Sequence, residues 1–240
     1  MSEASNNLLY KEAINWLYDM GCDEVVTESV RNFHGLREKE DNKIVFHKEG
    51  NSIKSFNLMN IMTIKELESY VKSYIAEYHN FSNSEFIFSD GNDNADLMVI
   101  GDKPASVDVK VGRPFQGDSG DLLNAMLKAI NYNKTNTFYT NINFYDSSIK
   151  FENSLLIVKK IISIVKPKVI IMFGAEATKA LTNKDKGIFH TRGKWFDIEI
   201  LDYNIVISGI SMFHPRYVLM HPESKKESWV DLKSVRQKLS

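Results

Sequence analysis

The stretch from residue 97 to residue 126 constrains the fold of this chain more than any other. A short apolar run ends at Gly101, a loop rich in glycine and proline follows, and an amphipathic helix is predicted to begin near Ser119. This order of strand, loop and helix is typical of an α/β unit, but the loop is much longer than the connection requires. Ligands of open α/β sheets bind beyond the carboxyl ends of the strands. We therefore expect a ligand site at this loop.

Strands and helices alternate along the rest of the chain. Strands are expected at 96–101, 137–142, 168–173 and 204–210, with a short antiparallel piece near 195–200, and helices at 119–131, 151–165, 174–182 and 222–239. The last helix is expected to bury Trp229 and Leu232. This pattern predicts an α/β fold with three layers, α/β/α, around a central four-stranded, mainly parallel sheet.

The segment before this α/β region has a different character. Residues 1–90 are predicted to form an N-terminal extension, partly helical and partly irregular, and residues 91–240 to form the α/β domain. Apolar residues at helical spacing predict a helix at 8–20, with Gly21 as its end. Thr63 followed by Glu66 is the pattern of a capping box, which predicts the start of a second helix.

The composition favours a soluble, intracellular protein. With 240 residues and 43% hydrophobic side chains, the chain can bury one substantial core. No apolar run approaches the roughly 18 residues of a membrane helix, and the polar start is not a secretory signal. We therefore expect a cytoplasmic monomer with no membrane association. Cys22 is the only cysteine, which excludes a disulfide framework and a four-thiolate metal or cluster site within the chain, so we expect no metal and no cofactor.

Charge is distributed unevenly along the sequence. Residues 1–150 contain 15 Lys and Arg against 22 Asp and Glu, whereas residues 151–240 contain 15 against 9. A basic second part is compatible with a face that binds nucleic acid. An uneven but inert surface explains the same numbers equally well.

Polar and aromatic side chains follow the ends of the predicted strands. Asp102 and the loop that carries Asp108 and Phe115 follow the first strand. Asn141 lies at the end of the second strand, and His214 follows the fourth. Because the carboxyl ends of parallel strands meet at one edge of a sheet, we expect these residues to share one pocket.

These side chains suit recognition of a pyrimidine base and cleavage of its N-glycosidic bond. Phe115 offers a stacking face, and the Asn141 amide can donate and accept along a base edge. His214 can donate a hydrogen bond to a carbonyl oxygen on which negative charge develops. Asp102 or Asp108 would then stabilise the cationic sugar or orient water. Structural roles remain open, with Phe115 in the core, Asn141 in a turn or cap and His214 at a helix entry.

Several motifs of the chain resemble those of the type 4, iron–sulfur uracil-DNA glycosylases. They are Gly101–Pro104 with Gly112–Gly117, Phe138–Asn141, Pro167–Ala177, Thr191–Trp195, and Phe213–Leu219 with Lys226–Leu232. These motifs occur in the family's order and extend over residues 95–240. The resemblance implies the fold of that family.

The resemblance also implies a DNA base-excision repair enzyme that flips uracil out of DNA and hydrolyses its N-glycosidic bond. Gly101 and Phe115 would contact the base, Asn141 would read its edge, and residues 216–220 would press into the duplex. His214 would lie at the O2 atom of the base. The residues implied to lie near phosphates are Arg192, Arg216, Lys225 and Lys226.

The chain departs from the family pattern at several points. Asp102 replaces a glutamate, Ala105 a glycine and Val109 an acidic residue. The four-iron–four-sulfur cluster of the family requires four cysteines, and this chain has Cys22 alone. The alternative hypothesis is therefore a catalytically weakened or inactive protein with the glycosylase fold that binds DNA. A generic nucleotide-binding protein is disfavoured, because the loop has no G-x-G-x-x-G or P-loop spacing.

Overall fold

A computed structural model describes residues 58, 60–78, 86–145 and 151–240 of the chain. The helix predicted at 8–20 lies outside these residues. The chain divides into two units, Met1–Asn60 and Ile61–Ser240, and the second unit is described below. The domain boundary predicted between residues 90 and 91 falls inside a strand of this second unit.

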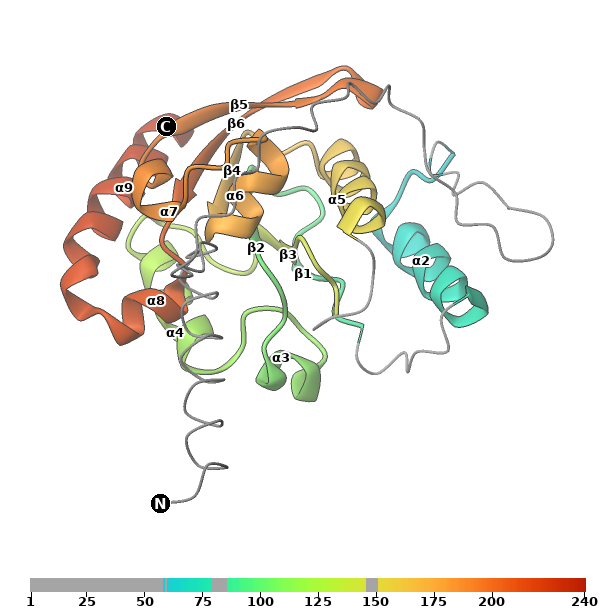
Figure 1. The fold of residues 1–240 in the computed structure, drawn as a ribbon, viewed down its shortest axis with the longest axis horizontal. Coiled ribbons are helices and arrows are strands. Elements are labelled where there is room, and N and C mark those ends of the chain that lie inside the picture. Colours follow the sequence, from blue (N-terminus) through green and yellow to red (C-terminus); the bar gives the residue numbers. More distant parts are fainter. Residues whose placement is uncertain (1–57, 59, 79–85, 146–150) are drawn as a thin grey trace, which may run out of the picture. The chain divides into compact units, whose positions relative to one another are not determined.

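The second unit is built on one mixed sheet of six strands (Figure 1). Their bounds are β1 Ser89–Gly91, β2 Leu97–Gly101, β3 Thr137–Asn141, β4 Val169–Phe173, β5 Trp195–Ile200 and β6 Ile205–Met212. The spatial order is β1-β3-β2-β4-β6-β5, in which the four central strands are parallel and the two edge strands antiparallel. The predicted four-stranded parallel sheet is thus the centre of a six-stranded one. The antiparallel β5 was anticipated, whereas β1 is too short and polar to give a strand pattern.

Eight helices accompany the sheet in the described residues. They are α2 Ile64–Tyr78, α3 Ser106–Val111, α4 Gly117–Lys128, α5 Phe151–Val165, α6 Ala175–Thr182, α7 Ile188–Thr191, α8 Pro215–Met220 and α9 Lys225–Leu239. The capping box predicted for α2 is present, because the Glu66 N–H donates to Thr63 Oγ1 at 3.2 Å and the Thr63 N–H donates to a Glu66 carboxylate oxygen at 3.3 Å. The short helices α3, α7 and α8 were not predicted as elements.

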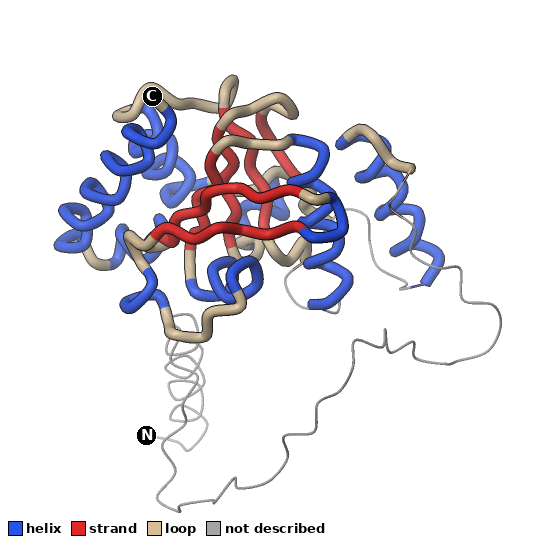
Figure 2. The backbone as a smooth tube through the Cα atoms, turned by 90° about the horizontal axis from the view of Figure 1, so that it is seen from above, coloured by secondary structure: helices blue, strands red, loops and turns tan. Residues whose placement is uncertain are grey.

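The helices cover both faces of the sheet, as expected for three layers (Figure 2). On one face, strand residues such as Val99 and Ile171 share a buried cluster with Leu127 of α4 and Leu232 of α9. On the other face, the Thr178 hydroxyl of α6 lies 2.8 Å from the Ser211 hydroxyl of β6, and α5 covers the sheet beside it (Figure 1).

The inward and outward faces of α5 give a test of the packing. Ile161 is fully buried, whereas Leu156 on the same helix is 42% exposed. We expect Ile161→Ala to lower the free energy of unfolding by about 2–5 kcal/mol, because it removes buried methyl groups and leaves a cavity. The matched control Leu156→Ala should cost less than about 1 kcal/mol. Urea denaturation of both variants measures the difference, and equal losses would contradict this packing.

Candidate active site

Four of the predicted site residues converge at the carboxyl edge of the sheet. Gly101 at the end of β2 is the register partner of Asn141 at the end of β3. A Cβ atom on Gly101 would lie 2.5 Å from Asn141 Oδ1 and 2.7 Å from Phe115 Cζ. The Phe115 ring in turn lies 6.1 Å from the His214 ring, between centroids, with the two planes inclined by 18°. An amide and an aromatic ring therefore meet at a position where only glycine fits, and the His214 ring lies nearly parallel to that aromatic ring.

The backbone of Phe115 adopts a conformation that residues other than glycine rarely adopt. Its φ is 55°, in the left-handed region, and its ring is only 8% exposed. Gly120 of α4 packs directly against the Phe115 carbonyl oxygen, where any Cβ would overlap that atom. Such a conformation costs on the order of 1–3 kcal/mol and persists only where neighbours impose it, most often at functional sites.

Asp108 is the neighbour that imposes this loop conformation. It is 5% exposed, and its two carboxylate oxygens accept hydrogen bonds from the Ala105 N–H at 2.8 Å and the Gln116 N–H at 2.6 Å. The second bond fixes the residue directly after Phe115. Both oxygens thus bind backbone amides, which favours a role in loop geometry over the predicted catalytic role.

Asn141 is buried without a protein partner for its side chain. It is 2% exposed, and the described part of the chain offers its amide no hydrogen bond. The backbone directly after Asn141 is held in place, because the N–H groups of Ile142 and Asn143 donate to the carbonyl oxygens of Gly101 and Asp102 at 2.8 and 2.9 Å. This amide lies beside the Phe115 ring and makes no hydrogen bond to the described residues, so its donor and acceptor are available to a ligand.

His214 begins α8 and is held in one tautomer. Its Nδ1 atom accepts a hydrogen bond from the Arg216 backbone N–H at 3.1 Å, as the N-cap of the helix. Burial, and next the positive charge of Arg216, lower the pKa of His214 from 6.5 to about 4. At neutral pH the ring is therefore uncharged, and because Nδ1 accepts, its proton resides on Nε2. His214 can donate a hydrogen bond from a fixed position.

Asp102 is anchored to a second helix. Its Oδ1 atom accepts a hydrogen bond from the Ala177 N–H at 2.7 Å, in the first turn of α6. Its carboxylate also lies against Gly174, whose φ is 99° and where any Cβ would overlap it. A helix N-terminus stabilises negative charge, so Asp102 holds a carboxylate at the edge of the site.

The residues predicted to contact phosphates fall into two groups. Arg192 makes a bidentate ion pair with Asp231 of α9, with Nη2–Oδ1 and Nε–Oδ2 distances of 2.6 and 3.3 Å. Asp231 is 3% exposed; burial raises the pKa of its carboxyl group, and Arg192 partly offsets this. Arg192 therefore joins α7 to α9 and is not presented to solvent as a free cation. Three others, Arg216, Lys225 and Lys226, have exposed side chains.

The residues of this chain do not fit the iron–sulfur cluster that the family resemblance implies. A four-thiolate cluster needs four cysteines, and the sequence contains one. Among the described residues, no three or more His, Cys, Asp and Glu side chains are grouped so that they could hold a metal ion. No helix in the same residues is long and apolar enough to span a membrane.

Comparisons of the sequence with known proteins identify a family for this chain. The sequence model of the uracil DNA glycosylase superfamily matches residues 88–233, more than half of the chain. The chain is 28% identical over 166 residues to the type-4 uracil-DNA glycosylase of Saccharolobus solfataricus, which covers 63% of this chain and 74% of that protein. It is 24% identical over 156 residues to the type-4 uracil-DNA glycosylase of Archaeoglobus fulgidus, covering 60% of this chain and 77% of the relative. The chain therefore belongs to the uracil DNA glycosylase superfamily.

Proposed function

We propose that this protein removes uracil from DNA by hydrolysing the N-glycosidic bond of an extruded nucleotide. The observation that carries the proposal is the meeting of Phe115 and Asn141 at Gly101, with the His214 ring facing the Phe115 ring. Relatives named type-4 uracil-DNA glycosylases support the same activity. Membership in the superfamily makes DNA the natural substrate class, and the products would be free uracil and an abasic site.

Recognition of the base follows from the side chains around Gly101. The Phe115 ring would stack on the uracil ring, and stacking of a base on an aromatic side chain contributes about 1–3 kcal/mol. The Asn141 amide has no protein partner in the described residues, and its donor and acceptor match the N3–H and O4 groups of uracil. Gly101 allows the Asn141 side-chain oxygen and the Phe115 ring to approach the end of β2 closely, because a Cβ there would lie 2.5 and 2.7 Å from them.

Catalysis would depend on stabilising two opposite charges. As the bond between C1′ and the base breaks, the electron pair goes to uracil, which leaves as an anion, while the sugar becomes cationic. His214 would donate its Nε2 proton in a hydrogen bond to O2 of the departing base. The Asp102 carboxylate would stabilise the sugar cation until water adds to C1′. Asp108 and Arg192, whose polar atoms bind other protein groups, would support this arrangement rather than touch the substrate.

The substitution of Ala105 for the family's glycine is compatible with activity. Ala105 is the N-cap residue of α3, with φ −87° and ψ 164°. This is an ordinary extended conformation that alanine adopts without strain. The second candidate function, binding of DNA without turnover, therefore finds no support at this position. It rests on Asp102, whose side chain is one methylene shorter than glutamate and is tied to α6.

The direct test is a single-turnover assay on DNA that contains one uracil, with excess protein and detection of alkali-sensitive abasic sites. We expect His214→Ala to lower the rate by about 100- to 1000-fold, because it removes a fixed donor to the leaving base. His190→Ala, at an exposed histidine on α7, is the matched control and should retain the wild-type rate. An unchanged rate for His214→Ala would remove His214 from the mechanism. Wild-type binding to DNA without cleavage would favour the second candidate function.

The low pKa of His214 predicts an unusual pH dependence. Histidine in the unfolded chain titrates near 6.5, and in the folded protein near 4. Between these values the unfolded state binds more protons, so the His214 contribution to stability is complete above pH 6.5 and is lost as the pH falls through 4. The Nε2 donor also remains neutral down to about pH 5. An NMR titration of the His214 ring should have its midpoint near 4, and a midpoint near 6.5 would refute this environment.

A further inference from the structure

We propose that the tip of α3, through Lys110 and Arg113, binds DNA phosphates on the side of the base pocket opposite to α8 and α9. This inference rests on the proposed function, since it adds a second phosphate-binding element to the same site. The residues implied by sequence to contact phosphates lie on α7, α8 and α9, all of which follow β4. The α3 tip instead belongs to the loop after β2.

The tip presents its cationic side chains to solvent. Lys110 and Arg113 are exposed, and neither forms an ion pair with a carboxylate in the described residues. The side chain of Val111 between them is 52% exposed, although it is apolar. Two unpaired cations that flank an exposed apolar side chain match a sugar–phosphate backbone, which offers anionic oxygens on either side of a less polar sugar.

The position of the tip is fixed relative to the base pocket by one residue. The Asp108 carbonyl oxygen accepts hydrogen bonds from the N–H groups of Gly112 at 2.7 Å and Arg113 at 3.2 Å. The side chain of the same Asp108 accepts the hydrogen bond from Gln116, next to Phe115. Gly112 allows the turn, with φ 76° and no atom within 4 Å of a would-be Cβ. The cationic tip and the stacking ring are thus positioned together, so that a strand bound by the tip would present its nucleotide at Phe115.

Topology brings the tip and α8 to the same edge of the sheet. α3 follows the carboxyl end of β2 and α8 follows the carboxyl end of the parallel β6, with β4 between these strands (Figure 1). The exposed Arg216, Lys225 and Lys226 begin α8 and α9. Asp118 and Asp121 on the first turns of α4 are also exposed, so the two cationic groups do not merge into one basic surface. The proposal therefore concerns discrete phosphate contacts at two points. Arg192 is bound to Asp231, whereas Lys110 and Arg113 of the α3 tip are exposed cations.

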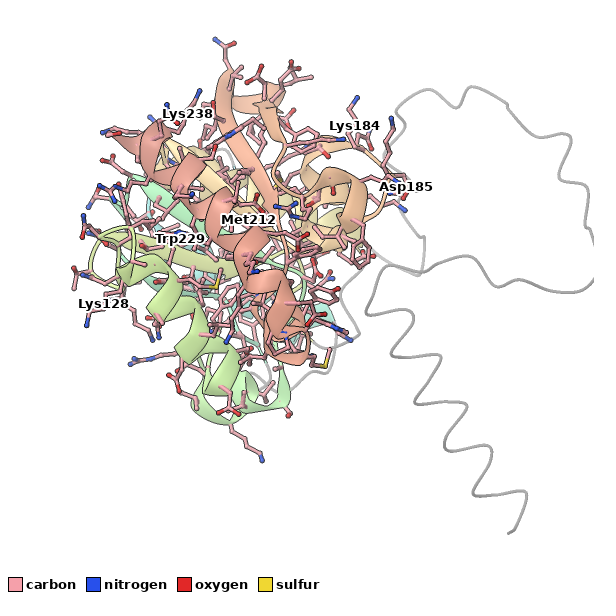
Figure 3. The ribbon with its side chains drawn as sticks, turned by 90° about the vertical axis from the view of Figure 1, so that its left-hand side faces the viewer. Lys128, Lys184, Asp185, Met212, Trp229 and Lys238 are labelled. Carbon is pink, nitrogen blue, oxygen red and sulfur yellow. The ribbon has the colours of Figure 1, made fainter. Side chains whose placement is uncertain are left out.

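The test measures how DNA binding depends on salt. Fluorescence anisotropy gives the affinity for a duplex that carries a non-cleavable abasic analogue, over a series of salt concentrations. Each phosphate contact contributes about 0.9 to the slope of log affinity against log salt on duplex DNA, so the Lys110→Ala/Arg113→Ala variant should lose about 1.8 from that slope. The charge-matched control is Lys128→Ala/Lys184→Ala. These exposed lysines lie at the C-terminal end of α4 and just after α6, on opposite sides of the fold in Figure 3. Its slope should equal that of the wild type. Both variants should keep the wild-type melting temperature.

A second measurement on the same proteins separates this inference from the proposed function. Uracil excision by the wild type is followed at saturating protein, where weaker binding no longer limits the rate, and the control Lys128→Ala/Lys184→Ala should match it. If the wild type excises uracil but the α3 variant keeps the wild-type slope, the inference is wrong and the function stands. If the slope falls but the wild type excises no uracil, the inference stands and the function is wrong. A wild-type protein that binds no DNA even at low salt would overturn both.

Discussion

The site of this protein depends on one buried carboxylate. Asp108 accepts two backbone hydrogen bonds with its side chain and two more with its carbonyl oxygen. Removing a carboxylate from water is costly unless donors replace the solvent, and here they come from residues at both ends of the loop. The loop is therefore closed upon itself, and the energy of these bonds maintains Phe115 in its left-handed conformation. A segment rich in glycine and proline becomes a rigid support for an aromatic ring.

His214 likewise serves both the local structure and the site. Its Nδ1 atom caps α8 by accepting the Arg216 N–H, so the ring proton resides on Nε2. From there it can be donated in a hydrogen bond to a ligand. A single hydrogen bond thus fixes both the start of α8 and the nitrogen of His214 that acts as donor. Asp102 is similar, since its bond to Ala177 stabilises the start of α6 and also keeps its charge at the edge of the sheet. Secondary structure and site chemistry are coupled because the side chains that cap the helices also belong to the candidate site.

Much of this arrangement could be predicted from the sequence, because long apolar runs and the rule of strand ends are local signals. The central strands and the convergence of Gly101, Phe115, Asn141 and His214 follow from them. The short helices α3, α7 and α8 could not be predicted, because four to six residues give no periodic pattern. The partners of Asp102 and Arg192 lie 75 and 39 residues away along the chain, beyond any local signal. Trp229 was expected inside and is 42% exposed, because its place on α9 turns it away from the face that carries Leu232.

The position of α9 has a consequence for biosynthesis. Leu232 and Val235 complete the cluster that covers one face of the sheet, and Asp231 supplies the partner of Arg192. All other elements of the unit leave the ribosome before this helix does. Until it docks, the apolar residues of β4 and β6 on that face and the guanidinium of Arg192 are open to water. The nascent unit therefore passes through a stage in which α4 alone covers this face of the sheet and apolar surface is still exposed.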